Sequence, residues 1–186
     1  IKLKRMDNYP TDIILWTKNL LKNFQYNITK EWENAISINF LRHFKTPMND
    51  GKFLGQGRNP GIEKLNDISF ENETVSKVFS SPSLRCIETS KKIFKNIKIE
   101  IDGDLKEFNY GKAEGISYKE LAIQFPNIIT DWENGKDPCF PDGENTNDVF
   151  NRLKFFLNSL AKNIDEEKLN SVAVVTHNGI LRCLVG

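Results

Sequence analysis

The sequence predicts an α/β fold, a three-layer α/β/α sandwich built on a mostly parallel central sheet. Short apolar runs alternate along the chain with segments of helical periodicity, which is the pattern of βαβ units. Crossover connections of this kind place helices on the faces of a parallel sheet. The chain has 186 residues, which suits one domain with a full core and leaves little room for a second.

The elements can be assigned in order. Four apolar runs bounded by polar turns are predicted strands, at residues 36–41, 75–79, 97–101 and 171–176. Apolar residues three or four positions apart predict helices, at residues 83–96, 117–125, 127–134 and 144–163, with another beginning at 179. In the helix 144–163, the spacing predicts that Phe155, Phe156 and Leu157 face other elements. A loop rich in Gly, Asn and Pro, from His43 to about Gly61, joins the first two strands.

Residues 1–35 are predicted to form an N-terminal helical extension. Residues 11–25 carry apolar side chains at helical spacing just after Pro10. Two interpretations remain open, a packing helix of the same domain or the remnant of an upstream domain. Residue 1 is Ile, and residues 179–186 resemble a helix just begun, so we expect both ends of the sequence to be cut.

Composition argues against several functions. Acidic and basic residues nearly cancel, giving a net charge of +1, and no dense basic cluster occurs, so neither nucleic acid nor an anionic membrane is an expected partner. No apolar stretch reaches the roughly 20 residues that span a bilayer. The three cysteines form no C-x-x-C pair, which predicts neither a disulfide framework nor a zinc site and favours a reducing cytoplasm.

The chemistry concentrates at predicted strand ends. His43 and His177 are the only histidines, and each lies just past the end of a predicted strand. Arg42 precedes His43, and Arg85 begins the helix after the second strand. Carboxyl ends of parallel strands share one sheet edge, so these groups should converge there. Guanidinium groups and a helix N-terminus bind phosphate oxygens, and the sequence therefore predicts a phosphoryl pocket.

Two other motifs carry less weight. Residues 55–61 (GQGRNPG) resemble a glycine-rich phosphate loop, but the glycine spacing is wrong and no strand precedes them. We interpret them as a substrate-side loop, with Gln56 as a candidate substrate-binding residue. Asp102 and Asp104 form a D-x-D that suggests a magnesium-dependent aspartyl phosphatase, yet such pairs are common in turns, and we interpret them as turn residues.

Five segments, in order, resemble the motifs of the histidine phosphatase superfamily, the phosphoglycerate-mutase-like proteins. The family patterns are L-R-H-G-x-T-x-x-N, S-S-P-x-x-R-x-x-x-T, L-x-E-x-x-x-G-x-x-E-G, P-x-G-E and V-x-H-G-G-x-x-R. The matching segments are residues 41–49 (LRHFKTPMN), 79–89 (FSSPSLRCIET), 105–115 (LKEFNYGKAEG), 141–144 (PDGE) and 174–182 (VVTHNGILR). The resemblance covers residues 36–186, implies a phosphoglycerate-mutase-like fold and favours the small phosphatase branch, with the C-terminal end of the domain incomplete.

The resemblance also implies roles. His43 would attack phosphorus to form a phosphohistidine, with its other ring nitrogen donating to a carbonyl or carboxylate. Glu107 would be the acid for the leaving oxygen, with Glu114 as its rival. The remaining implied contacts to the phosphoryl group or substrate come from Arg42, Arg85, His177, Asn49 and Asn178. No cofactor or metal is implied.

Departures from the pattern leave alternatives open. Phe44 stands where the family has Gly after the nucleophile, and Asn178 replaces a second Gly. A bulky Phe44 would either narrow the pocket or turn away from it. Besides a phosphatase for a small phosphorylated metabolite, the sequence allows a phosphoglycerate-mutase-type phosphotransferase or a non-catalytic phospholigand-binding module. A kinase-like domain upstream in the same polypeptide is a further expectation.

Overall fold

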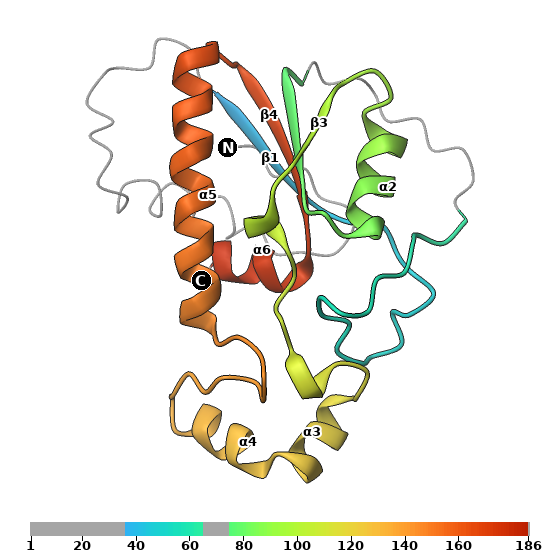
Figure 1. Ribbon diagram of the computed structural model, residues 1–186, viewed down its shortest axis with the longest axis vertical. Coiled ribbons are helices and arrows are strands. Elements are labelled where there is room, and N and C mark those ends of the chain that lie inside the picture. The colour runs from blue at the N-terminus through green and yellow to red at the C-terminus, as the bar shows by residue number, and fades with distance from the viewer. Residues whose placement is uncertain (1–35, 65–74, 186) are drawn as a thin grey trace.

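A parallel sheet forms the centre of the protein. The computed structural model describes residues 36–64 and 75–185, so the extension predicted at 1–35, with its helix at 11–25, lies outside the described residues. In the described part, the sheet has four strands in the order β1-β4-β2-β3, and every neighbouring pair is parallel (Figure 1). The strands are β1 (Ser37–Arg42), β2 (Lys77–Ser80), β3 (Ile99–Ile101) and β4 (Ser171–Thr176). The predicted α/β fold is confirmed.

The central position of β4 explains why its sequence was the easiest to interpret. This strand pairs with β1 on one side and β2 on the other, and its residues from Val172 to Thr176 are buried. A strand covered on both faces reads as a continuous apolar run, and its bounds agree with the predicted 171–176. The strands β2 and β3 are two residues shorter at their start than predicted, because pairing begins only at Lys77 and Ile99.

Helices cover both faces of the sheet. The helices α2 (Leu84–Ile93) and α5 (Thr146–Glu167) lie on opposite sides of it in Figure 1, and α6 (Asn178–Val185) packs against α5 and β1. Asn145 begins α5 through a capping box with Asp148, and the helix continues four residues beyond the predicted end. No helix in the described ranges is long and apolar enough to cross a bilayer.

A smaller subdomain lies beyond the carboxyl edge of the sheet. It contains α3 (Tyr118–Gln124) and α4 (Pro126–Glu133), seen at the bottom of Figure 1, and it is reached through two short 3₁₀ helices, η1 (Gly103–Leu105) and η2 (Gly111–Ala113). Ser117 starts α3 with a capping box, and Pro126 occupies the first turn of α4. Its core is aromatic and aliphatic, formed by Ala113, Leu121, Ile128 and Phe140. The subdomain therefore has its own packing and stands over the site.

The prediction that Phe155 of α5 faces other elements is wrong. The buried stripe of this helix is Val149, Leu153, Phe156, Leu160 and Ile164. Phe155 lies outside that stripe and is 71% exposed, whereas Phe156 is 2% exposed and packs edge-on against Phe79, with ring centroids 5.8 Å apart. Three consecutive apolar residues cannot all face one way on a helix, because each step turns it by about 100°.

Substitution of the two adjacent phenylalanines should separate core packing from exposed surface. Phe156→Ala removes a ring from the contact between α5 and the sheet, so we expect the free energy of unfolding to fall by about 3–5 kcal/mol. Phe155→Ala is the matched control and should change it by less than about 0.5 kcal/mol. Urea denaturation followed by circular dichroism measures both. Equal losses would contradict this packing.

Candidate active site

The two histidines meet at the carboxyl edge of the sheet. β1 and β4 are adjacent and parallel, and Arg42 pairs with Thr176 in the last register position. The next residues are His43 and His177, whose ring centroids lie 5.3 Å apart. The His43 backbone N–H also donates to the Thr176 carbonyl at 3.0 Å, which continues the ladder beyond the strands. Parallel pairing thus brings together side chains that are 134 positions apart in the sequence.

His43 has a defined tautomer. Its Nδ1 lies 2.6 Å from the carbonyl oxygen of Phe44, which can only accept, so Nδ1 carries the hydrogen. The other nitrogen, Nε2, is then unprotonated while the ring is neutral. Burial, together with the charges of Arg85 and Arg42, lowers the pKa of His43 to about 4. A buried neutral imidazole with a free Nε2 lone pair is a nucleophile across the neutral pH range.

His177 is held in place by Arg85 and Ser81. Arg85 donates from Nε to Nδ1 of His177 at 3.3 Å, and Ser81 Oγ lies 2.8 Å from Nε2. Because arginine only donates, Nδ1 must accept, and the neutral ring carries its hydrogen on Nε2. Burial is the main cause, and the charge of Arg85 the next, of a His177 pKa well below its ordinary value.

Arg85 is a fully buried cation. It donates from Nη2 to the Gly55 carbonyl at 2.9 Å, from Nη1 to the Arg58 carbonyl at 3.2 Å, and from Nε to His177. These contacts use three of the five N–H donors of a guanidinium. No carboxylate of the described residues forms an ion pair with it. Two unused donors and a cation without a directly paired carboxylate thus favour binding of an anion beside the histidines.

Glu114 holds the loop that orients Arg85. Its carboxylate accepts the backbone N–H groups of Gln56, at 2.7 Å, and Gly57, at 2.9 Å. Gly55 has a φ of +64°, and a Cβ there would lie 1.9 Å from the Glu114 carboxylate. Only glycine therefore permits this close approach. Its two oxygens hold backbone donors of this loop, so Glu114 anchors the loop.

Glu107 lies beside the start of α6. Its side chain is buried, with Oε1 accepting the Phe108 backbone N–H at 3.0 Å and Oε2 accepting that of Gly179 at 3.4 Å. A Cβ on Gly179 would lie 2.4 Å from Oε1, so glycine is needed here as well. Burial raises the pKa of Glu107, in opposition to its two backbone hydrogen bonds and the charges of Arg85 and Arg152. A raised pKa suits a carboxylic acid that must donate a proton near neutrality.

The remaining predicted site residues are more exposed than the two histidines. Arg42 is exposed at the end of β1, and Asn178 is half-buried in the first turn of α6. Asn49 is exposed and accepts the Thr46 backbone N–H at 2.8 Å, which shapes the loop after His43. Gln56 is half-buried and donates its amide to the Glu107 carbonyl at 2.8 Å. Its assignment as a substrate-binding residue stays a prediction.

The sequence did not single out several residues that support the site. Ser81 holds His177, and the Cys86 sulfur lies 3.5 Å from His177 Nε2. Both belong to the segment 79–89, where attention fell on Arg85. Arg152 and Glu144 form a half-buried ion pair next to Glu107, with Nε and Oε1 2.9 Å apart. Their separation of eight residues gives no periodic signal that would have linked them to Glu107.

The acidic pair of the 3₁₀ turn has a local role. Asp102 accepts the backbone N–H of Asp104 at 2.8 Å and caps η1, as expected of turn residues. Within residues 36–64 and 75–185, no group of three or more His, Cys, Asp and Glu side chains could hold a metal ion.

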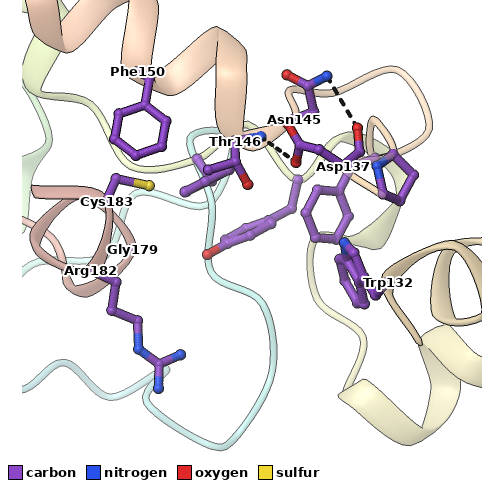
Figure 2. Close-up of a pocket in the computed structure, with 12 residues that line it drawn as sticks. Trp132, Asp137, Asn145, Thr146, Phe150, Gly179, Arg182 and Cys183 are labelled. Carbon is purple, nitrogen blue, oxygen red and sulfur yellow. Dashed lines mark hydrogen bonds between the residues drawn. The ribbon is translucent and has the colours of Figure 1, made fainter. Parts of the chain in front are cut away.

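A separate pocket of about 470 Å³ lies between α6 and the α3–α4 subdomain. Figure 2 shows Trp132 and Arg182 on different sides of it, with Asp137 bonded to Asn145 and Thr146 at the start of α5. Its walls include Gly179, which also contacts Glu107, but neither histidine. The pocket therefore adjoins the candidate acid without being part of the phosphoryl site.

Comparison with protein families decides the relationship. The histidine phosphatase superfamily (branch 1) matches residues 38–186, which is most of the chain. This chain belongs to the histidine phosphatase superfamily. The predicted resemblance is confirmed, and relatives named as phosphatases support a phosphatase enzyme.

Several curated relatives of this histidine phosphatase domain are longer proteins. It is 31% identical over 163 residues to agropine synthesis reductase of Rhizobium rhizogenes, covering 77% of this chain and 33% of that protein. It is 29% identical over 119 residues to 6-phosphofructo-2-kinase/fructose-2,6-bisphosphatase of Caenorhabditis elegans, covering 62% of this chain and 25% of that one. It is 31% identical over 151 residues to fructose-2,6-bisphosphatase TIGAR of Xenopus tropicalis, covering 71% of this chain and 52% of that protein. The chain thus spans between a quarter and about half of these relatives.

Solved structures share the fold. A putative alpha-ribazole-5'-P phosphatase from Escherichia coli has a TM-score of 0.65 at 21% identity, covering 82% of this chain and 78% of that one. Phosphoglycerate mutase from Bacillus anthracis has a TM-score of 0.60 at 22% identity, covering 82% of this chain and 79% of that one. The predicted phosphoglycerate-mutase-like architecture of the histidine phosphatase domain is confirmed.

The lowered pKa of His43 predicts a pH-dependent stability. Between pH 6.5 and about pH 4, the unfolded chain binds a proton on His43 that the folded protein does not, so the free energy of unfolding decreases as pH falls. His43→Asn lacks this group. We expect the wild-type value to fall by up to about 3 kcal/mol more than that of the variant between pH 7 and pH 4. Denaturant unfolding at several pH values measures both, and parallel declines would contradict the lowered pKa.

Proposed function

We propose that this domain is a metal-independent phosphatase that hydrolyses a small phosphomonoester through a phosphohistidine on Nε2 of His43. The observation that carries the proposal is the bond from His43 Nδ1 to the Phe44 carbonyl, which leaves Nε2 as the nucleophilic nitrogen beside the buried charge of Arg85. The relatives named as bisphosphatases act on phosphate esters by their names, which supports the same substrate class here.

In the first proposed step, Nε2 attacks phosphorus while the bond from phosphorus to the ester oxygen breaks. Glu107 gives its proton to the departing oxygen, which leaves as an alcohol. Arg85 balances the charge on the phosphoryl oxygens with its two remaining donors, and Arg42 reaches the same edge of the sheet. Dividing one displacement at phosphorus into two lowers the activation barrier of each step.

In the second step, water attacks the phosphohistidine. The Glu107 carboxylate takes the proton of this water, the bond between phosphorus and nitrogen breaks, and inorganic phosphate leaves. Both ring nitrogens of His177 have protein partners, and only Nε2 carries a hydrogen, so His177 contacts the phosphoryl group by exchanging its Nε2 bond to Ser81 for one donated to a phosphoryl oxygen. Its Nδ1 continues to hold Arg85 in position.

Phe44 is less of an obstacle to turnover than its size implies. Its side chain is 5% exposed and belongs to the core, while its backbone N–H donates to Thr89 Oγ1 at 2.9 Å and its carbonyl orients His43. The contacts that the nucleophile needs from this position are backbone contacts, which any residue supplies. This supports a catalytic domain over a non-catalytic binding module.

The wider setting of the domain is a separate proposal. A relative whose name joins a kinase to a bisphosphatase is compatible with a kinase-like domain upstream in the same polypeptide. A cytoplasmic location likewise remains an expectation that rests on the absence of a cysteine framework.

The phosphohistidine should be trapped chemically. Brief incubation with an activated phosphate donor should label the protein with phosphate that is stable to alkali and lost in acid. His43→Ala removes the acceptor nitrogen, so we expect no label, with circular dichroism showing that the fold remains. Ser81→Ala is the matched control, because it alters a neighbour of His177 and keeps His43. Undiminished labelling of His43→Ala would refute the mechanism.

Activity should not depend on a metal ion. Phosphate release by the purified protein is expected to be unchanged in excess EDTA, because Arg85 and Arg42 supply the positive charge. A phosphate-release screen against metabolite monoesters, with and without chelator, makes the measurement. Loss of turnover that magnesium restores would move the assignment to Asp102 and Asp104.

A further inference from the structure

Arg152 uses every donor of its guanidinium inside the protein. Its Nε donates to Glu144 Oε1, Nη1 donates to the carbonyls of Asp104 and Lys106, and Nη2 donates to the Glu107 carbonyl and Glu144 Oε2. This accounts for all five N–H groups. Arg85, by contrast, leaves two donors unused. Arg85 can therefore still bind a ligand, whereas Arg152 is committed to protein groups.

The carbonyls that Arg152 binds belong to the segment that carries Glu107. Those of residues 104, 106 and 107 accept from the guanidinium, and the intervening Leu105 carbonyl accepts from Thr176 Oγ1 at 2.8 Å. Thr176 immediately precedes His177 at the end of β4. Four consecutive carbonyls are thus fixed, by α5 on one side and by the strand that carries His177 on the other.

Glu144 extends these contacts beyond Glu107. Its Oε2 accepts the backbone N–H of Asn109 at 2.8 Å and lies 3.4 Å from the Gln56 amide nitrogen. Gln56 in turn donates to the Glu107 carbonyl at 2.8 Å. The side chains of Arg152 and Glu144 are 14% and 19% exposed, so the pair is shielded from solvent. The Glu107 segment is therefore held along its whole length, from residue 104 to 109.

We propose that the Arg152–Glu144 pair is a clamp that positions Glu107 as the general acid, with Gln56 tying it to the loop that orients Arg85. This inference rests on the acid role of Glu107 in the proposed function. Held in this way, the Glu107 carboxyl stays against the Gly179 N–H, where it faces the start of α6. Proton donation tolerates little displacement, so a loosened segment loses the contribution of the acid while the nucleophile is unaffected.

Substrates with different leaving groups distinguish a role of Arg152 in positioning Glu107 from a general structural role. A p-nitrophenyl ester leaves as a stabilised anion and needs little help from an acid, whereas an alkyl ester needs its oxygen protonated. We therefore compare kcat/KM, which reports formation of the phosphohistidine, for p-nitrophenyl phosphate and for an alkyl phosphomonoester. Arg152→Met should lower the alkyl value by about 100-fold and the p-nitrophenyl value by less than about threefold. Arg152→Lys should recover part of the alkyl value.

The same measurement on combined variants identifies the route of the effect. If Arg152 acts through Glu107, adding Arg152→Met to Glu107→Gln should cause no further loss on the alkyl ester. Lys77→Met is the matched control. Lys77 is equally shielded, with 14% exposure, and pairs with Glu100 and Glu167, but it lies at the start of β2, away from the site. Its loss should leave the ratio of the two values unchanged.

Each result bears on one proposal. Equal losses on both esters in Arg152→Met, no loss on either, or additive losses with Glu107→Gln would overturn the clamp. If Arg152→Met does not fold, Glu144→Gln replaces it, because it keeps the shape of the side chain while removing the charge from the pair, and it should show the same selective loss. A wild-type protein that releases no phosphate from either ester would overturn the proposed function itself.

Discussion

A positive charge buried at the carboxyl edge of the sheet is the constraint on which the site depends. Arg85 is fully buried, its charge is not matched by a carboxylate of the described residues, and desolvation of such an ion is costly. The protein offsets that cost with the carbonyls of Gly55 and Arg58 and the ring nitrogen of His177. An oxyanion that binds here completes the compensation, which links the stability of this region to ligand binding.

The surrounding structure follows from the need to hold that cation. The loop that supplies the two carbonyls is itself fixed by Glu114, and its Asn59 side chain accepts the Leu84 N–H at the start of α2. Burial, and after it the charge of Arg85, lowers the pKa values of His43 and His177, so both rings are neutral near pH 7. A neutral His43 is what nucleophilic attack requires. In the proposed mechanism, the same buried guanidinium would bind the substrate phosphate and add to the effect of burial in keeping the nucleophile unprotonated.

Much of this arrangement could be predicted from the sequence. Strand ends are marked by a change from apolar to polar residues, and parallel pairing then brings His43, Arg85 and His177 together without further information.

The hydrogen-bond partners of these residues were beyond prediction. The partner of His43 is the carbonyl of the very next residue, and backbone carbonyls leave no trace in a residue pattern. The contact made by Gln56 was beyond prediction for a related reason, since its partner, the Glu107 carbonyl, is 51 positions away and is set by tertiary packing. Local spacing does distinguish Phe155 from Phe156, because Phe156 continues the buried stripe of α5 in steps of three and four residues and Phe155 does not.

The position of the phosphoryl group on the His43 ring tests the central claim most directly. Because Nδ1 is committed to the Phe44 carbonyl, the account requires the new bond to form at Nε2. Protein labelled with ¹⁵N at the histidine ring nitrogens and trapped with an activated phosphate donor can be studied by ³¹P and ¹⁵N NMR, in which coupling identifies the bonded nitrogen. The account predicts a single Nε2-phosphohistidine at residue 43. Phosphate on Nδ1, or on His177 instead of His43, would contradict it.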